Sequence, residues 1–146
     1  ECFVQAGRMP ERIREYCQRT GQPEPESPGQ IVRCIYESLA LRYAQVWEKL
    51  IQYTDTQPDT LHIVGGGCQD KLLSQFAANA IGVTVQAGPV EATGLGNIMA
   101  QMMADKTINS LAEGRVIVAN SFPVDNFTPQ DGPIWAEAKK RFAQIQ

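Results

Sequence analysis

The chain has 146 residues, of which 43% are apolar and 20% are charged. This composition excludes an intrinsically disordered chain and is typical of one ordinary globular domain. The formal net charge is −3, so no excess of positive charge favours binding to nucleic acid. No apolar stretch approaches the roughly 18 residues that span a bilayer, and we expect no membrane partner. Because the sequence begins with Glu1 rather than Met, we expect a piece of a longer protein.

The cysteines indicate the redox compartment. Cys2, Cys17, Cys34 and Cys68 are too widely spaced for a zinc site of the usual kind, and the chain has one His. Reduced thiols in a cytoplasmic protein are the simplest interpretation. The alternative is one disulfide between Cys17 and Cys34, which flank a proline-rich linker and could meet if the flanking helices pack side by side.

The N-terminal part of the chain predicts an extended segment and a short helix. Residues 1–9 are expected to be extended and could supply one edge of a sheet. Pro10 suits the first position of a helix, where its missing N–H costs nothing, and Gly21 ends that helix. Three prolines over residues 20–28 then predict a linker.

The clearest helix start in the sequence follows this linker. Ser27 is the expected cap, and Gln30 can reach back to it in a capping box. Apolar residues then recur at three- and four-residue steps: Ile31, Ile35, Leu39, Tyr43, Val46, Leu50 and Tyr53. This spacing predicts a long amphipathic helix over residues 28–53, with one face for a core.

Strand and helix patterns alternate in the middle of the chain. Residues 61–64 form a strand-like run that stops at three glycines. Helical spacing then resumes over residues 72–80, and Gly82 is the expected end of that helix. Residues 83–85 alternate as a second strand, and Gly88-Pro89 turns the chain.

The last third of the chain is predicted to be mostly helical. Helices are expected to begin at Thr93, Ser110 and Pro133, with a loop over residues 122–129. Residues 116–118 would also suit a strand, so the sequence does not decide between a helix and a strand after Ser110. The fold class is therefore α/β, helix-rich with few strands. Because two strands rarely form a sheet alone, further strands should lie upstream in the full protein.

The sharpest functional feature is the junction of strand, Gly65-Gly66-Gly67 and helix. Three residues without Cβ atoms would let a flat ligand lie directly on the peptide planes. Mononucleotides often bind at such strand ends in open α/β sheets. The alternative is a tight turn without a ligand, and local sequence does not separate the two. The chain has neither the dinucleotide fingerprint nor a Walker A loop.

Two residues beyond the glycines bear on this site. Asp70 is expected in the first turn of the next helix, where a carboxylate favours the helix dipole. Its charge would repel a triphosphate, so the base or ribose of a nucleotide should face the glycines. Cys68 lies at a helix start, which can activate a thiol, but no base is near it in sequence. No catalytic constellation and no metal-ligand cluster is visible.

Taken together, these motifs resemble the FGGY family of carbohydrate kinases. The matching segments are residues 33–43 (RCIYESLALRY), 61–69 (LHIVGGGCQ) and 87–98 (AGPVEATGLGNI). The glycine block alone resembles only the wider family. The stretch from Gly88 to Ile98 is more specific to the branch that phosphorylates L-rhamnulose.

The resemblance implies a two-lobed enzyme of the actin/hexokinase/Hsp70 type, with ribonuclease-H-like lobes. Residues 1–146 would be the C-terminal part of the second, nucleotide-side lobe, and the N-terminal lobe of the same protein would be its partner. The implied reaction transfers the γ-phosphate of ATP, with Mg²⁺, to L-rhamnulose and gives L-rhamnulose 1-phosphate. The catalytic base, the phosphate loop and the sugar pocket would lie outside this fragment, which alone should be inactive.

The site residues implied by the resemblance lie on the adenosine side of the ATP site. They are Gly65, Gly66, Gly67 and Asp70, although the family usually has Asn where this chain has Asp70. Three other functions remain open. One is an FGGY kinase for xylulose, fuculose or glycerol, the second is a non-catalytic domain of the same fold, and the third is a thiol redox module built on Cys68.

Overall fold

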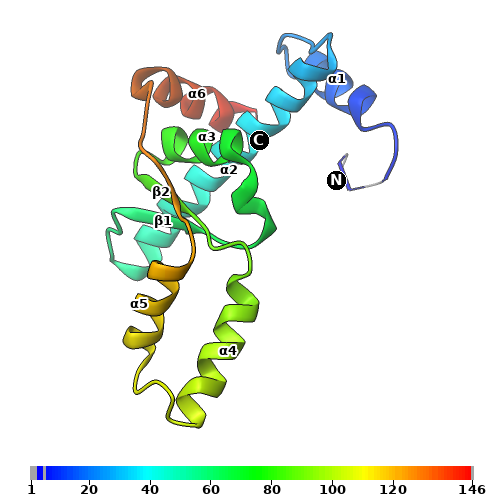
Figure 1. Ribbon diagram of the computed structural model, residues 1–146. Coiled ribbons are helices and arrows are strands. Elements are labelled where there is room, and N and C mark those ends of the chain that lie inside the picture. The colour runs from blue at the N-terminus through cyan, green and yellow to red at the C-terminus, as the bar shows by residue number, and fades with distance from the viewer. Residues whose placement is uncertain (1–2, 5, 146) are drawn as a thin grey trace.

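The computed structural model describes residues 3–4 and 6–145 (Figure 1). Over these residues the helices are α1 (Met9–Arg19), α2 (Pro28–Thr54), α3 (Lys71–Ile81), α4 (Ala92–Ala104), α5 (Leu111–Ser121) and α6 (Gly132–Gln144). The strands are β1 (Thr60–Ile63), β2 (Thr84–Ala87) and β3 (Asp125–Phe127), and a 3-10 turn, η1, spans Gly66–Gln69. The helix-rich α/β class predicted from the sequence is confirmed.

The sheet has the strand order β1-β2-β3. β1 and β2 are parallel, with Leu61 opposite Val85, whereas β3 runs antiparallel to β2, with Phe127 opposite Val85. β3 lies in the segment that the sequence predicted as loop, so that prediction was wrong. Its three residues, Asp-Asn-Phe, have little strand character of their own, and pairing with the second edge of β2 supplies it.

The segment before α1 also differs from its prediction. Residues 1–2 and 5 lie outside the described part of the chain. The remaining residues before Met9 form turns and bends, and none of those described is in a strand. α1 is held instead by apolar contacts of Ile13 and Cys17 with Ile31 of α2, and by the Tyr16 hydroxyl, which donates to the carbonyl of Ile145 at 2.8 Å.

The start of α2 follows its sequence signal closely. The Ser27 hydroxyl accepts from the Gln30 N–H at 3.2 Å, and the Gln30 side-chain oxygen accepts from the Ser27 N–H at 3.0 Å. The predicted capping box is therefore confirmed. Four N–H groups at a helix start lack partners within the helix, and this box satisfies two donors in that region.

The buried face of α2 is not the one that its bulky residues predict. Its buried positions are Ile31, Ala40, Leu41, Ala44 and Trp47. Most of the predicted stripe is exposed, from Tyr43 at 37% to Tyr53 at 86%. Ala40 and Ala44 of this face pack against Ala80 of α3, where methyl side chains let the two helices approach closely. The stripe from Leu39 to Tyr53 is therefore an exposed apolar surface, whereas Ile31, at the start of the predicted stripe, packs with Ile13 and Cys17 of α1.

α3 lies at the centre of the packing. On one side, Ala80 joins Ala40 and Ala44 of α2 and Trp135 of α6 in an apolar cluster. On the other side, Ala77 and Ala78 pack on Val85 in the middle of the sheet. α3 ends where the sequence predicts, because Gly82 adopts a left-handed conformation with φ +85°.

α4 and α5 form a pair that extends away from the sheet on the side opposite α3 and α6 (Figure 1). α4 begins at Ala92 rather than at Thr93 and buries no residue. α5 begins after Ser110, whose hydroxyl accepts from the Glu113 N–H, and residues 116–118 are helical. The two helices meet where Gly114 faces Met99.

The loop after β2 gives a prediction about stability. Gly88 has φ +129°, and a Cβ there would lie 2.9 Å from the carbonyl oxygen of Pro123. We expect Gly88→Ala to lower the free energy of unfolding by about 1–3 kcal/mol, because an L side chain is strained there and meets rigid main chain. Urea unfolding measures this change.

The matched control is Gly94→Ala, at a helical position in α4 where a Cβ would meet no described atom within 4 Å. Alanine favours a helix over glycine, so this variant should be unchanged or more stable by up to about 1 kcal/mol. Equal destabilisation by both substitutions would contradict the backbone geometry assigned to Gly88.

Candidate functional site

The candidate site lies where the parallel strands β1 and β2 end side by side. The chain leaves β1 through Gly65-Gly66-Gly67 and leaves β2 through Gly88-Pro89. Two main-chain hydrogen bonds join these exits: Gly65 N–H donates to the Pro89 carbonyl at 3.2 Å, and Gly88 N–H donates to the Ile63 carbonyl at 2.8 Å. The junction that the sequence singled out therefore lies at the carboxyl end of the sheet, where open α/β sheets bind ligands.

The three glycines of this junction have different roles. Gly65 has φ +79°, a conformation that L side chains rarely adopt, so the turn itself requires glycine there. Gly66 and Gly67 lie in η1 without a positive φ, and a Cβ on either would meet no described atom within 4 Å. Neither conformation nor packing among the described residues explains the second and third glycines. The open space above them is what a flat ligand needs.

Asp70 occupies a different position from the one predicted. η1 intervenes between the glycines and α3, so Asp70 is the N-cap of α3 and not a residue of its first turn. Its Oδ1 accepts from the Leu73 N–H at 3.0 Å. Its Oδ2 accepts from the Tyr36 hydroxyl on α2. Asp70 thus joins the end of the segment from Gly65 to Asp70, called the glycine turn below, to both α3 and α2.

The two side chains of this contact shift each other's ionisation. The Leu73 N–H and the Tyr36 hydroxyl lower the pKa of Asp70, so it is an anion at neutral pH. The hydrogen bond to Asp70, with a smaller effect of burial, raises the pKa of Tyr36, which stays protonated as the donor. A neutral donor therefore faces a negatively charged acceptor.

Tyr36 is the residue of the site that the sequence did not reveal. It lies on the same face of α2 as Ala40, one turn earlier, where it is half-buried. One signal could have found it: a tyrosine on a packed helix face needs a partner for its hydroxyl. The identity of that partner depends on how α2 crosses α3, which local sequence does not determine.

The cysteines do not form a reactive site in this structure. Cys68 is buried in η1. Cys17 and Cys34 are free thiols, so the structure contains no bridge between them, and Cys2 lies outside the described residues. Burial, followed by the nearby Cys17 thiol, raises the pKa of Cys34 and makes it less reactive than an ordinary cysteine.

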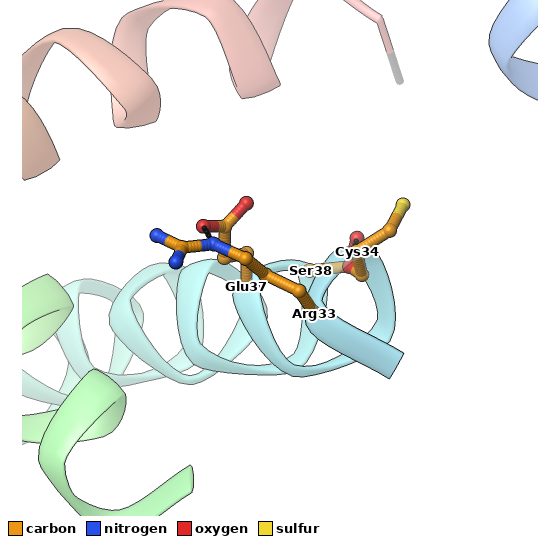
Figure 2. Close-up of polar contacts among 4 residues, drawn as sticks. All are labelled: Arg33, Cys34, Glu37 and Ser38. Carbon is orange, nitrogen blue, oxygen red and sulfur yellow. Dashed lines mark hydrogen bonds and ion pairs between the residues drawn. The ribbon is translucent and has the colours of Figure 1, made fainter. Parts of the chain in front are cut away.

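The polar side chains around Cys34 bond to one another or to the main chain of α2. In Figure 2, Arg33 and Glu37 point toward each other on α2 and form an ion pair at 2.7 Å, while the Cys34 sulfur points away from them. The Ser38 hydroxyl donates to the Cys34 carbonyl at 2.7 Å. No base for thiol chemistry is part of this group.

Other classes of site are not found here. Among the described residues, no three His, Cys, Asp or Glu side chains gather where they could hold a metal ion. None of the helices in that part of the chain is long and apolar enough to cross a bilayer. A cavity of about 1120 Å³ lies between α1, the proline linker, α2 and α6, and the residues of the glycine turn do not line it.

Comparison with known proteins identifies the family. Residues 3–104 match the C-terminal domain of the FGGY family of carbohydrate kinases. The chain is 49% identical over 142 residues to a rhamnulokinase of Bacteroides thetaiotaomicron, 40% identical over 142 residues to one of Enterobacter sp. strain 638, and 42% identical over 142 residues to one of Enterococcus faecalis. These alignments cover 97%, 97% and 96% of this chain.

The chain spans only part of these relatives. The alignments cover 29% of the first two and 28% of the third. The helix-rich α/β structure agrees with the ribonuclease-H-like fold that the sequence resemblance implied. This chain belongs to the FGGY family of carbohydrate kinases and carries part of the C-terminal domain of that family.

Proposed function

We propose that the protein containing this chain is an ATP-dependent kinase that phosphorylates L-rhamnulose at its 1-hydroxyl, and that this chain supplies the adenosine side of the ATP site. The family match supports phosphoryl transfer to a carbohydrate. Identities of 40–49% to three rhamnulokinases favour L-rhamnulose over the xylulose, fuculose or glycerol alternatives. Nothing observed favours a thiol redox function, because Cys68 is buried.

One observation carries the assignment of the nucleotide side. Gly66 and Gly67 follow the carboxyl end of β1 without a positive φ that requires glycine, and no described atom lies within 4 Å of where their Cβ atoms would project. A purine or ribose can then contact the main chain at a distance that any Cβ would prevent. Gly65, Gly66 and Gly67 are therefore the proposed contact surface, and Asp70 borders it.

The charge of Asp70 determines which end of the nucleotide faces this surface. An anion at neutral pH repels the triphosphate, so the adenosine should lie on the glycines with its phosphates directed away from α3. Asp70 also satisfies the start of α3 with its own carboxylate. A phosphate is thus not the expected ligand of this helix N-terminus.

The remaining chemistry is assigned to the rest of the protein. Among the described residues, no three His, Cys, Asp or Glu side chains gather as a metal site, and the carboxylate beside the glycines, Asp70, is already occupied by the Leu73 N–H and the Tyr36 hydroxyl. The sugar, the catalytic base and the metal ligands would be held by the upstream part of the second lobe and by the N-terminal lobe. What this chain does is bind and orient adenosine and keep side chains out of that space. Positioning of this kind is a large part of phosphoryl-transfer catalysis.

Replacing Gly66 tests the proposed site. In the full-length protein, we expect Gly66→Leu to raise the KM for ATP by about tenfold or more, because the new side chain fills the space above the turn. The KM for L-rhamnulose should change less than twofold. Steady-state kinetics with each substrate varied in turn measures both constants.

Gly132→Leu is the matched control for this experiment. Gly132 lies at the start of α6, where a Cβ also meets no described atom within 4 Å, and it is not part of the glycine turn. It should leave both constants unchanged. A larger effect of Gly66→Leu on the sugar KM than on the ATP KM would show that the site is misplaced.

The isolated chain gives a second test. Residues 1–146 carry no proposed base and no proposed sugar pocket, so they should not phosphorylate L-rhamnulose at any ATP concentration. A coupled ADP-release assay on the purified fragment, with the full-length protein as the positive control, measures this. Sugar-dependent ADP release by the fragment would refute the assignment of the catalytic base to another part of the protein.

A further inference from the structure

We propose that Tyr36 is a positioning residue for nucleotide binding: its hydroxyl holds the Asp70 carboxylate against α2, which keeps that negative charge out of the space above the glycines where the nucleotide binds. This inference rests on the proposed function of the turn. It concerns α2, a helix for which the sequence analysis predicted a core-facing side but no site residue. Tyr36 itself would not touch the nucleotide.

A short chain of hydrogen bonds links Tyr36 to the glycines. The Tyr36 hydroxyl donates to Oδ2 of Asp70. The main-chain N–H of Asp70 donates to the carbonyl of Gly67 at 3.2 Å and closes η1. The other carboxylate oxygen is occupied by the Leu73 N–H at 3.0 Å. Movement of Asp70 would therefore disturb both Gly67 and the first turn of α3.

The two ends of the glycine turn are anchored differently. At its first residue, Gly65 is fixed by main-chain bonding to Pro89. At the other end, the side chain of Asp70 is fixed to α2 by the hydroxyl of Tyr36. A side-chain anchor can be altered by substitution without changing the main chain.

Nearby cations do not replace this contact. Lys71, the next residue, pairs with Asp125 of β3 at 3.0 Å. Arg33, one turn before Tyr36 on α2, pairs with Glu37 at 2.7 Å. Without the tyrosine hydroxyl, one oxygen of the Asp70 anion would lose its side-chain donor. A carboxylate freed in this way can turn toward the ligand space and repel the nucleotide phosphates.

The test uses Tyr36→Phe in the full-length protein, because phenylalanine keeps the ring and removes only the hydroxyl. We expect the KM for ATP and the Kd of a fluorescent ATP analogue to rise by about three- to tenfold. The kcat at saturating ATP and the KM for L-rhamnulose should each stay within about twofold of the unsubstituted enzyme. Tyr53→Phe, on the same helix at an 86% exposed position, is the matched control and should change none of these values.

A double variant separates positioning from loss of structure. Asparagine caps a helix about as well as aspartate and carries no charge, so it should not need the tyrosine donor. We therefore expect Tyr36→Phe combined with Asp70→Asn to return the ATP KM most of the way to that of the unsubstituted enzyme. A structural defect at Tyr36 would not be rescued in this way.

The outcomes are distinct. A normal ATP KM in Tyr36→Phe, together with a raised ATP KM in Gly66→Leu, overturns this inference and leaves the proposed function standing. A fall in thermal midpoint with equal losses for both substrates, not rescued by Asp70→Asn, also overturns it. Normal ATP constants in both Tyr36→Phe and Gly66→Leu refute the proposed placement of adenosine on the glycines, and the inference with it.

Discussion

Close contact between alanines of α2 and α3 is the constraint on which the rest of the structure depends. Ala40, Ala44 and Ala80 are almost completely buried. Because small side chains lie at the centre of this contact, α2 comes near enough for Tyr36 to reach the start of α3. α3 in turn packs on the sheet. The position of the glycine turn therefore follows from helix packing as well as from the strand that precedes it.

Local signals in the sequence predicted local structure well. The capping box at Ser27 and the end of α3 at Gly82 depend on hydrogen bonds and dihedral angles within a few residues. The strand β3 and the buried face of α2 were not predicted, because each depends on a partner distant in sequence. The family resemblance could not reveal them either, since it rested on motifs and not on packing.

The candidate site was predicted only in part for the same reason. The junction of three glycines was recognisable as a motif. The structure adds that the turn requires glycine at Gly65, whose φ is positive, but not at Gly66 or Gly67. Asp70 was expected within the first turn of α3 but is its N-cap, because η1, which has no strong sequence signature, comes between the glycines and the helix. The exposed apolar stripe on α2 and the 29% coverage of two relatives agree with the proposal that this chain packs against further polypeptide of the same protein.

The central claim is that adenosine lies on the main chain of Gly66 and Gly67. A crystal structure of the full-length protein with a non-hydrolysable ATP analogue tests it most directly. The account predicts the purine or ribose in van der Waals contact with these two residues, with the phosphates directed away from Asp70. Side chains from elsewhere in the protein filling that space, with the nucleotide bound at another position, would contradict it.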